Sequence, residues 1–131
     1  MNDIKPNSIE AVILFILYIC IQDGVISEEE SKELIITAPL IQKMYLDIFG
    51  EYIAFDLELI IDEMLEKLYE YRDSISGKRV STKEKNLFSS LLTDHATQDI
   101  ALLASRTSAG ADGIHELENI KYKYWAQQWN V

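Results

Sequence analysis

An uninterrupted apolar stretch, Ala11–Ile21, constrains the fold of this chain more than any other feature. Its sequence, AVILFILYICI, contains no charged residue, no Gly and no Pro, and the turn residues Asp23 and Gly24 follow it closely. A helix that is apolar on every side has no face to present to water, so we expect it to be the central element around which other helices pack. A bilayer span needs about 20 apolar residues, so the stretch predicts a core helix and no membrane partner.

The net charge of the chain limits the kinds of molecule that we expect it to bind. The chain has 22 acidic and 12 basic residues, which gives a formal net charge of −10. Nucleic-acid binding needs a basic surface, so we expect no nucleic-acid partner, whereas cations or a basic protein would suit this charge. The one cysteine, Cys20, cannot form an intrachain disulfide, which is typical of a reducing compartment, most simply the cytoplasm.

Helix start and stop signals divide the chain into the helices of a single all-α domain, residues 1–131. The expected N-cap of the first helix is Asn7 or Ser8, and Ser27 and Ser81 are expected to cap two later helices in capping boxes of the form S-x-x-E. Pro39 is expected to separate two helices, because proline disfavours helical backbone in the residue before it. The patterns predict a compact bundle of six to seven helices around a buried N-terminal helix. The expected helices run from about 8 to 21, 27 to 37, 39 to 50, 51 to 74, 81 to 92, 94 to 104 and 116 to 129.

A turn built on Asp-Gly occurs twice and is followed each time by an acidic helix start. The first copy is DGVISEEE, Asp23 to Glu30, and the second is ADGIHELE, which ends at Glu118. Each copy places an Asp in a turn and a Glu in the next helix, which is an arrangement that can gather oxygen ligands for a hard divalent cation. The plainer interpretation is a common turn followed by acids that the helix dipole favours. Both interpretations stay open from the residues alone.

These two turns resemble motifs of the TerB-like family, the small helical domain of tellurite-resistance proteins. Asp23, Gly24, Ile26, Ser27 and Glu30 match the first motif of that family, x-D-G-x-[IV]-[ST]-x-x-E. The second motif is matched at the turn near the C-terminus. The resemblance implies a compact all-helical fold for most of the chain.

The resemblance also implies a divalent-metal site. Carried over by position, its ligands would be Asp23, Glu30, Asp112 and Glu118, and the ion would be one such as calcium or magnesium. The second copy departs from the first, because Glu118 lies six residues after its Asp whereas Glu30 lies seven after its own. One residue turns a helix by about 100°, so the second carboxylate is expected to point in a different direction.

Acidic residues recur every four positions in the longest expected helix. Like charges at that spacing repel each other by a few tenths of a kcal/mol per pair. The row consists of Glu58, Asp62, Glu66 and Glu70, and a second acidic cluster contains Glu28, Glu29 and Glu33. One interpretation is a solvated helix face. The other is a docking surface for a basic protein, since complementary charge accelerates association and selects partners.

The chain carries no motif of an enzyme. It lacks the phosphate-binding, dinucleotide-binding, serine-nucleophile and zinc-protease patterns, so we expect no catalytic residue. On the last expected helix, Tyr122, Trp125 and Trp129 are expected to close the core while Lys121, Lys123 and Tyr124 face outward. The function that the sequence favours is an immunity protein that neutralises a basic toxin by direct binding and uses no cofactor. The alternative is a TerB-like, metal-binding protein of stress or tellurite resistance.

Overall fold

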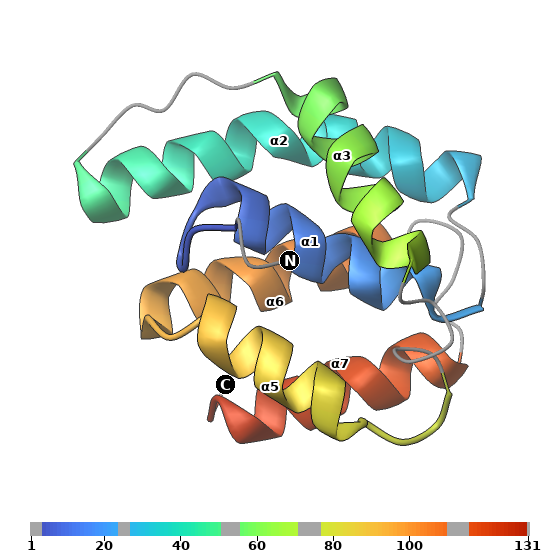
Figure 1. Ribbon diagram of the computed structural model, residues 1–131. Helices are drawn as coiled ribbons and strands as arrows, with labels where there is room; N and C mark the ends of the chain where they lie inside the picture. The colour runs from blue at the N-terminus through green and yellow to red at the C-terminus, as the bar shows by residue number, and fades with distance from the viewer. Residues whose placement is uncertain (1–3, 24–26, 51–55, 71–76, 110–115, 131) are drawn as a thin grey trace.

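The computed structural model describes residues 4–23, 27–50, 56–70, 77–109 and 116–130. Within these ranges every regular element is helical, so the predicted all-α class is confirmed (Figure 1). One short 3₁₀ turn, η1, follows the first helix. The elements are α1 (Ile9–Cys20), η1 (Ile21–Asp23), α2 (Glu28–Phe49), α3 (Leu57–Glu70), α5 (Thr82–Leu91), α6 (His95–Ala109) and α7 (Glu116–Gln128).

Helix α1 is the centre of the molecule, as its apolar sequence predicts. Eleven of its twelve residues are buried, and only Glu10 is partly exposed. Figure 1 shows α2 and α3 on one side of α1 and the pair α5 and α7 on the other, and α6 packs along its length. A helix enclosed on every side needs no polar stripe, and this is why the apolar stretch could run uninterrupted.

Aromatic rings fill the space between α1 and the α5–α7 pair. The Phe15 ring lies edge-on to the Phe88 ring at 5.3 Å between centroids and 5.2 Å from the Trp129 ring. Trp125 is 1% exposed and Trp129 is 8% exposed, so the expectation that both tryptophans close the core is confirmed. Such ring pairs add about 0.5–1.5 kcal/mol each to the area that they bury.

The predicted N-caps are present. Ser8 caps α1, and Ser27 and Ser81 each complete a capping box with a glutamate at the third helical position. Helix α3 begins at Leu57 and not at the expected residue 51. The Asp56 carboxylate accepts a hydrogen bond from the backbone N–H of Leu59, an N-cap interaction that fixes the start there.

The predicted helix break at Pro39 is wrong. α2 continues through this residue as a single helix of 22 residues. Pro39 lies on the exposed face, whereas Ile41 and Tyr45 beyond it are buried against the core. An internal proline costs about 3 kcal/mol in helix stability. Burying the two large side chains of the following turns offsets that cost, at about 1.5–3 kcal/mol each.

Candidate partner-binding surface

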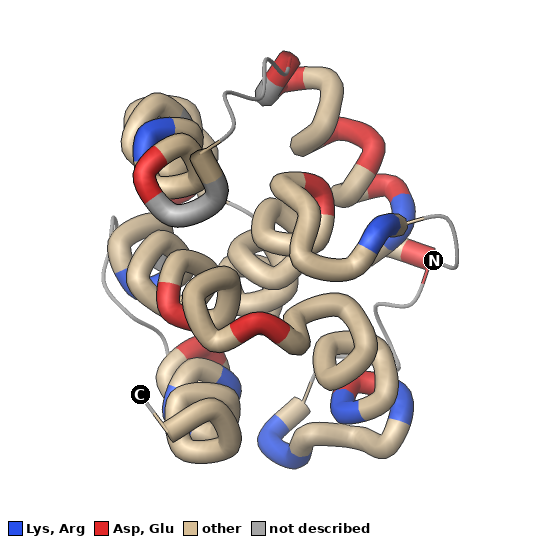
Figure 2. Tube along the Cα trace, turned by 90° about the vertical axis from the view of Figure 1, so that its left-hand side faces the viewer, with Lys and Arg blue, Asp and Glu red and all other residues tan. Residues whose placement is uncertain are grey.

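The acidic row on α3 lies on the face of the helix that points away from the core. Ile60, Ile61, Met64 and Leu68 of α3 are buried, and a helix that buries this stripe turns the opposite face to solvent. All four residues of the predicted row are exposed: Glu58, Asp62, Glu66 and Glu70. In the tube of Figure 2 the acidic positions recur along α3, whereas most of the central α1 carries no charge.

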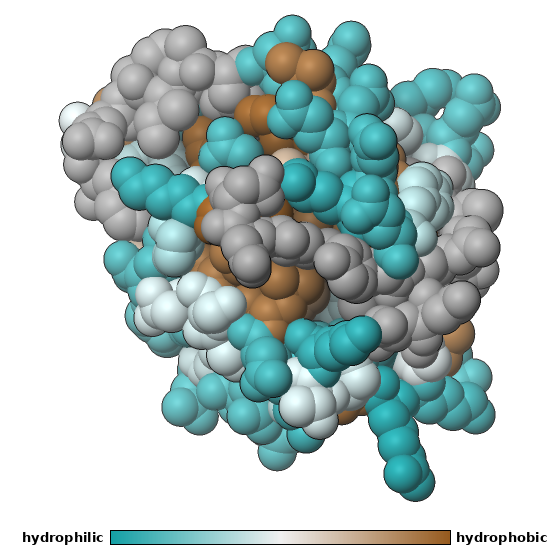
Figure 3. Space-filling view, viewed as in Figure 1, coloured by the Kyte–Doolittle hydropathy of each residue, from teal (hydrophilic) through white to brown (hydrophobic). Residues whose placement is uncertain are grey.

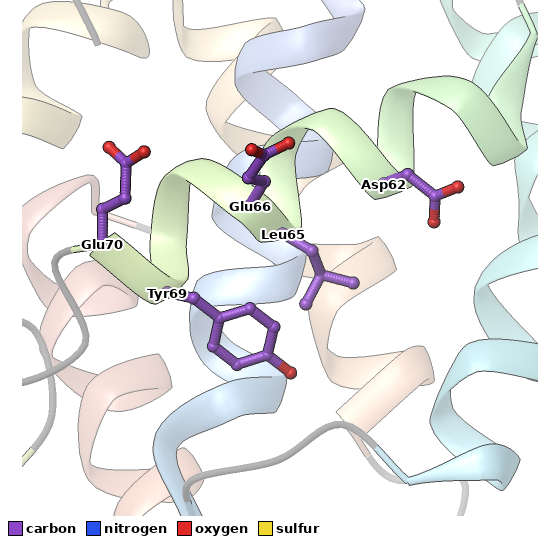
Figure 4. A pocket seen from close by; sticks show the side chains of 5 residues that line it. All are labelled: Asp62, Leu65, Glu66, Tyr69 and Glu70. Carbon is purple, nitrogen blue, oxygen red and sulfur yellow. The ribbon is translucent and has the colours of Figure 1, made fainter.

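A shallow depression of about 650 Å³ lies against this face of α3. It is lined by Asp62, Leu65, Glu66, Tyr69 and Glu70. Figure 4 shows the carboxylates of Glu66 and Glu70 projecting from one side of the helix, while Leu65 and Tyr69 project from the other side. Tyr69 is 45% exposed, so an aromatic ring is available to a partner beside the acids.

Few basic side chains compensate the acids of α3. A second depression, of about 410 Å³, is lined by Glu63, Glu66 and Glu70 together with Lys67, the one basic residue of the helix. Figure 3 shows the corresponding face as a largely hydrophilic surface with apolar side chains at its upper end. The arrangement concentrates negative charge around a small apolar area. This combination favours a cationic partner that also has an apolar group.

The second predicted acidic cluster lies in the first turns of α2. Glu28 and Glu29 are exposed and Glu33 is half-buried, whereas Glu30 between them is buried. Its carboxylate oxygen Oε1 accepts the backbone N–H of Ser27 at 3.0 Å and completes the capping box. In Figure 1 the start of α2 and the end of α3 both lie on the right-hand side of the molecule.

The residues of the alternative metal site are only partly described. Asp112 lies outside the described residues, and Asp23 is described in its backbone alone. Glu30 and Glu118 are 1% and 0% exposed, and the helix that carries Glu118 packs against η1, where Asp23 ends the turn. Among the described side chains, no group of three or more His, Cys, Asp or Glu residues is arranged to hold a metal ion.

The sequence did not indicate a buried polar cluster that the described residues form around Glu84 and Lys121. Glu84 and Lys121 form an ion pair in which both side chains are 0% exposed, although Lys121 was expected to face outward. The hydroxyl of Tyr18 donates to Glu84 Oε1 at 2.7 Å and accepts from Trp125 Nε1 at 3.3 Å. Lys121 Nζ also donates to the carbonyl of Arg79 at 3.2 Å.

This buried cluster joins three helices and is closed to solvent. Tyr18 belongs to α1, Glu84 to α5, and Lys121 and Trp125 to α7. Burial, together with the neighbouring carboxylate, raises the pKa of the Tyr18 hydroxyl well above its ordinary value. These groups are 0–1% exposed, and their hydrogen bonds connect the three helices. The sequence signal was the S-x-x-E box itself, whose Glu84 was considered only as a cap.

His95 begins helix α6 and lies beside Asp99. Its Nε2 lies 3.6 Å from Asp99 Oδ2, and both side chains are well exposed, at 68% and 48%. The pair occupies adjacent turns on the surface of α6. Among the described residues, no helix is both long enough and apolar enough to span a membrane.

Comparisons of this chain with protein-family models, with curated proteins and with solved structures found no match.

Proposed function

We propose that this chain is a non-catalytic binding protein that captures a basic protein through the exposed acidic face of α3. The observation that carries the proposal is the row Glu58, Asp62, Glu66 and Glu70, which is solvent-exposed along its whole length. Repulsion between these carboxylates lowers the stability of the free helix. A cationic partner would relieve that repulsion. The row therefore favours binding of such a partner, whereas it does not stabilise the free protein.

The partner would be a toxin, and the protein its immunity factor in the cytoplasm. An immunity protein must capture its target before the target acts, and complementary charge raises association rates up to about 10⁸–10⁹ M⁻¹s⁻¹ at low salt. The exposed Tyr69 and the half-buried Leu65 would provide the apolar contact that slows dissociation. The acids Glu28, Glu29 and Glu33 on α2 would extend the same negative field.

The test compares three immobilised proteins as bait for cell extract from the source organism. The first is the wild type, the second is the charge reversal D62K/E66K, and the third is the matched control D47K/E116K. The control reverses two exposed acids on α2 and α7 and changes the net charge equally. A specific partner should be retained by the wild type and the control, be lost with D62K/E66K, and elute as salt is raised.

The toxin assignment is tested with the retained partner. Expressing that protein alone should stop growth, and co-expressing the wild type, but not D62K/E66K, should restore it. A partner that D62K/E66K retains equally well, or that binds independently of salt, would remove the electrostatic part of the proposal.

A divalent-cation-binding function of the TerB-like kind is the second candidate. Two acids of the motif, Glu30 and Glu118, support it, because both are buried and the helix that carries Glu118 packs against η1, which ends at Asp23. Carboxylate oxygens are the donors that calcium and magnesium prefer, so Glu30 and Glu118, together with Asp23 and Asp112, are chemically suited to hold such an ion. When bound, the ion would neutralise the carboxylates and link the helices that carry them.

A thermal melt after EDTA treatment separates the two candidates. Calcium, magnesium or manganese at a hundred times its dissociation constant should stabilise the fold by about 2.7 kcal/mol, and Asp23→Asn should remove that gain. D62K/E66K should leave the gain intact. If no ion changes the melting temperature, the two Asp-Gly turns serve only as turns.

A further inference from the structure

The depression against α3 combines an apolar surface with negative charge. Leu65 and Tyr69 lie one helical turn apart, and Figure 4 shows both side chains projecting from the same side of the helix. Leu65 is half-buried, whereas Tyr69 is 45% exposed. Asp62, Glu66 and Glu70 complete the lining, and among the described residues no Lys or Arg belongs to it. A group bound there would meet an aromatic ring, an aliphatic side chain and carboxylates.

The one basic residue of α3 faces away from this depression. Successive residues turn an α-helix by about 100°, so Asp62 lies about 20° from Tyr69 around the helix axis, whereas Lys67 lies about 160° from it. Lys67 instead lines the second depression, together with three glutamates. A cation that approaches the Tyr69 ring is therefore attracted by carboxylates of α3 and is not repelled by a like charge of this helix.

Other tyrosine rings of the protein show which side chains suit such an aromatic face. A Lys or Arg group lies over the rings of Tyr18, Tyr122 and Tyr124, at 5.6 Å to 5.9 Å from the ring centroid. The face of an aromatic ring carries partial negative charge, which attracts the cation. Among the described residues, no cation lies over the ring of Tyr69, although this ring lies beside carboxylates. A cation from a partner protein would match the pattern of the other three rings.

Arginine suits this surface better than lysine does. The planar guanidinium group stacks on aromatic rings and forms two parallel hydrogen bonds with a carboxylate, whereas the lysine ammonium is a compact and more strongly hydrated charge. The aliphatic part of an arginine can lie on an apolar side chain while its charged end reaches an acid. Side chains of a helix lean toward its N-terminus, and Figure 4 shows the Tyr69 ring leaning toward Leu65. An arginine laid across Leu65 therefore brings its guanidinium group over the ring.

We propose that the acidic face of α3 recognises its basic partner through an arginine, whose guanidinium group stacks on the Tyr69 ring and pairs with the carboxylates beside it. This inference rests on the proposed function, because it names the side chain by which the captured protein is recognised. The acids attract any cation over a long range, whereas contact with the ring favours a guanidinium group. Loss of the ring therefore removes selectivity, and loss of an acid weakens the binding of every cation.

Two synthetic peptides, hexa-arginine and hexa-lysine, are the probes that test this proposal. They have the same length and charge, so a difference between their affinities reports the contact and not the long-range attraction. In NMR titrations at physiological salt, the wild type should bind hexa-arginine more tightly, with the largest shifts at the backbone amides of Leu65 to Glu70. Tyr69→Leu should weaken hexa-arginine binding by about two- to five-fold and hexa-lysine binding by less, as expected for an exposed cation–π contact.

Tyr69→Phe and Leu59→Ala are the matched controls for the ring. The first keeps the aromatic ring and should bind both peptides as the wild type does. The second removes another exposed apolar side chain of α3, one that does not line the depression, and should leave both affinities unchanged. Both positions are exposed, so we expect all three variants to fold, and circular dichroism checks this.

Neutralising one acid tests the carboxylates separately from the ring. Asp62→Asn removes a carboxylate that lines the depression and should weaken the binding of both peptides. The matched control is Asp47→Asn, which removes one exposed acid of α2 and changes the net charge equally. This control should weaken binding less, because its carboxylate does not belong to the lining. Equal effects of the two variants would mean that the peptides respond to net charge alone, contrary to the proposal.

The variants at Tyr69 and Leu59 decide whether the arginine contact exists. Equal losses of affinity for the two peptides in Tyr69→Leu would overturn it. A Tyr69→Phe or Leu59→Ala variant that loses as much affinity as Tyr69→Leu would also overturn it. These results would not affect the proposed function, because the acidic row is intact in all three variants. Retention of the natural partner by D62K/E66K would overturn the proposed function instead, and the peptide titrations cannot produce that result.

Discussion

Charged side chains lie in opposite environments on α3 and at the junction of α5 with α7. On α3, four carboxylates at spacing four are exposed and repel one another. At the junction, one carboxylate and one ammonium, Glu84 and Lys121, are fully buried and paired. The exposed row is conspicuous in the sequence, whereas the buried pair has no sequence pattern of its own.

The charges that are easiest to see in the sequence are not the ones that contribute most to the stability of the fold. Water and salt screen the exposed row, so each of its acids changes stability by only a few tenths of a kcal/mol. The buried pair has no water to replace a missing partner, so loss of one member leaves the other uncompensated. We therefore expect substitutions in the buried pair to lower stability more than substitutions in the exposed row, although only the row can be recognised in the sequence.

Removing the buried ammonium should have the largest effect. Lys121→Met keeps most of the side-chain volume but leaves the Glu84 carboxylate buried without its cation, a loss of about 3–5 kcal/mol of stability. Urea denaturation of the wild type and the variant gives the difference directly. The control is Lys123→Met on the same helix, whose side chain is exposed and which should change little.

The double variant Glu84→Gln with Lys121→Met sharpens this result. Removing both charges should recover part of the stability lost in Lys121→Met alone, because no unpaired charge remains buried. A double variant that loses the full sum of the two single effects would show that the two residues act independently, contrary to the ion pair.

Tyr18→Phe should have the next largest effect. It removes the acceptor of the Trp125 indole and one donor to Glu84, which costs about 1–3 kcal/mol for a buried hydrogen-bonding group at neutral pH. The folded protein raises the pKa of Tyr18, while an unfolded tyrosine ionises near its ordinary value of about 10. The stability from protonated Tyr18 is therefore complete below about pH 10 and declines as the pH rises above it.

The measurement is the stability of wild type and Tyr18→Phe at a series of pH values from neutral to alkaline. Their difference should be constant up to about pH 10 and shrink beyond it, since phenylalanine does not ionise. A difference that stays constant in strong alkali would show that Tyr18 ionises equally easily in the folded and unfolded states.

The two capping boxes should respond unequally to the same substitution. Ser27→Ala at the start of α2 should cost about 1 kcal/mol, the usual loss of an N-cap. Ser81→Ala at the start of α5 should cost more, because the Ser81 hydroxyl holds the backbone of Glu84, which positions the buried pair. Thermal melts of both variants measure the two losses of stability. Equal losses would show that the Ser81 cap does not contribute to the stability of the ion pair.

Neutralising the exposed row should have the smallest effect on stability and the opposite sign. Asp62→Asn with Glu66→Gln removes repulsion along α3 and should stabilise the protein by a few tenths of a kcal/mol. The gain should be visible at low salt and fade at high salt, because salt already screens these charges. A loss of stability here would mean that the row supports the fold.

The sequence predicted the parts of the fold that depend on local signals. Ser8, Ser27 and Ser81 cap helices because their hydroxyls satisfy N–H groups a few residues away, and the apolar α1 had to be buried. The acidic row was predicted to be a helix face, and it is exposed as a helix of that pattern requires.

Features that depend on distant residues escaped prediction. Pro39 does not end α2, because the burial of Ile41 and Tyr45 outweighs a local preference. Lys121 lies between two half-buried residues, Ile120 and Tyr122, and nothing near it in the sequence indicates the carboxylate 37 residues earlier that draws it inward. The exposed apolar side chains of α2 also escaped prediction, since their exposure depends on which face of α2 packs against α6.

Because α1 is central, the helices that cover it are complete only after nearly the whole chain has been synthesised. Its partners include α6 and α7, and the Tyr18–Trp125 contact joins residues 107 positions apart. Ribosomes add about 5–20 residues per second, so roughly 5–20 seconds pass between the emergence of α1 and that of α7. During this interval the most apolar helix of the chain has only part of its cover, which makes the nascent chain a natural client of chaperones that bind apolar segments.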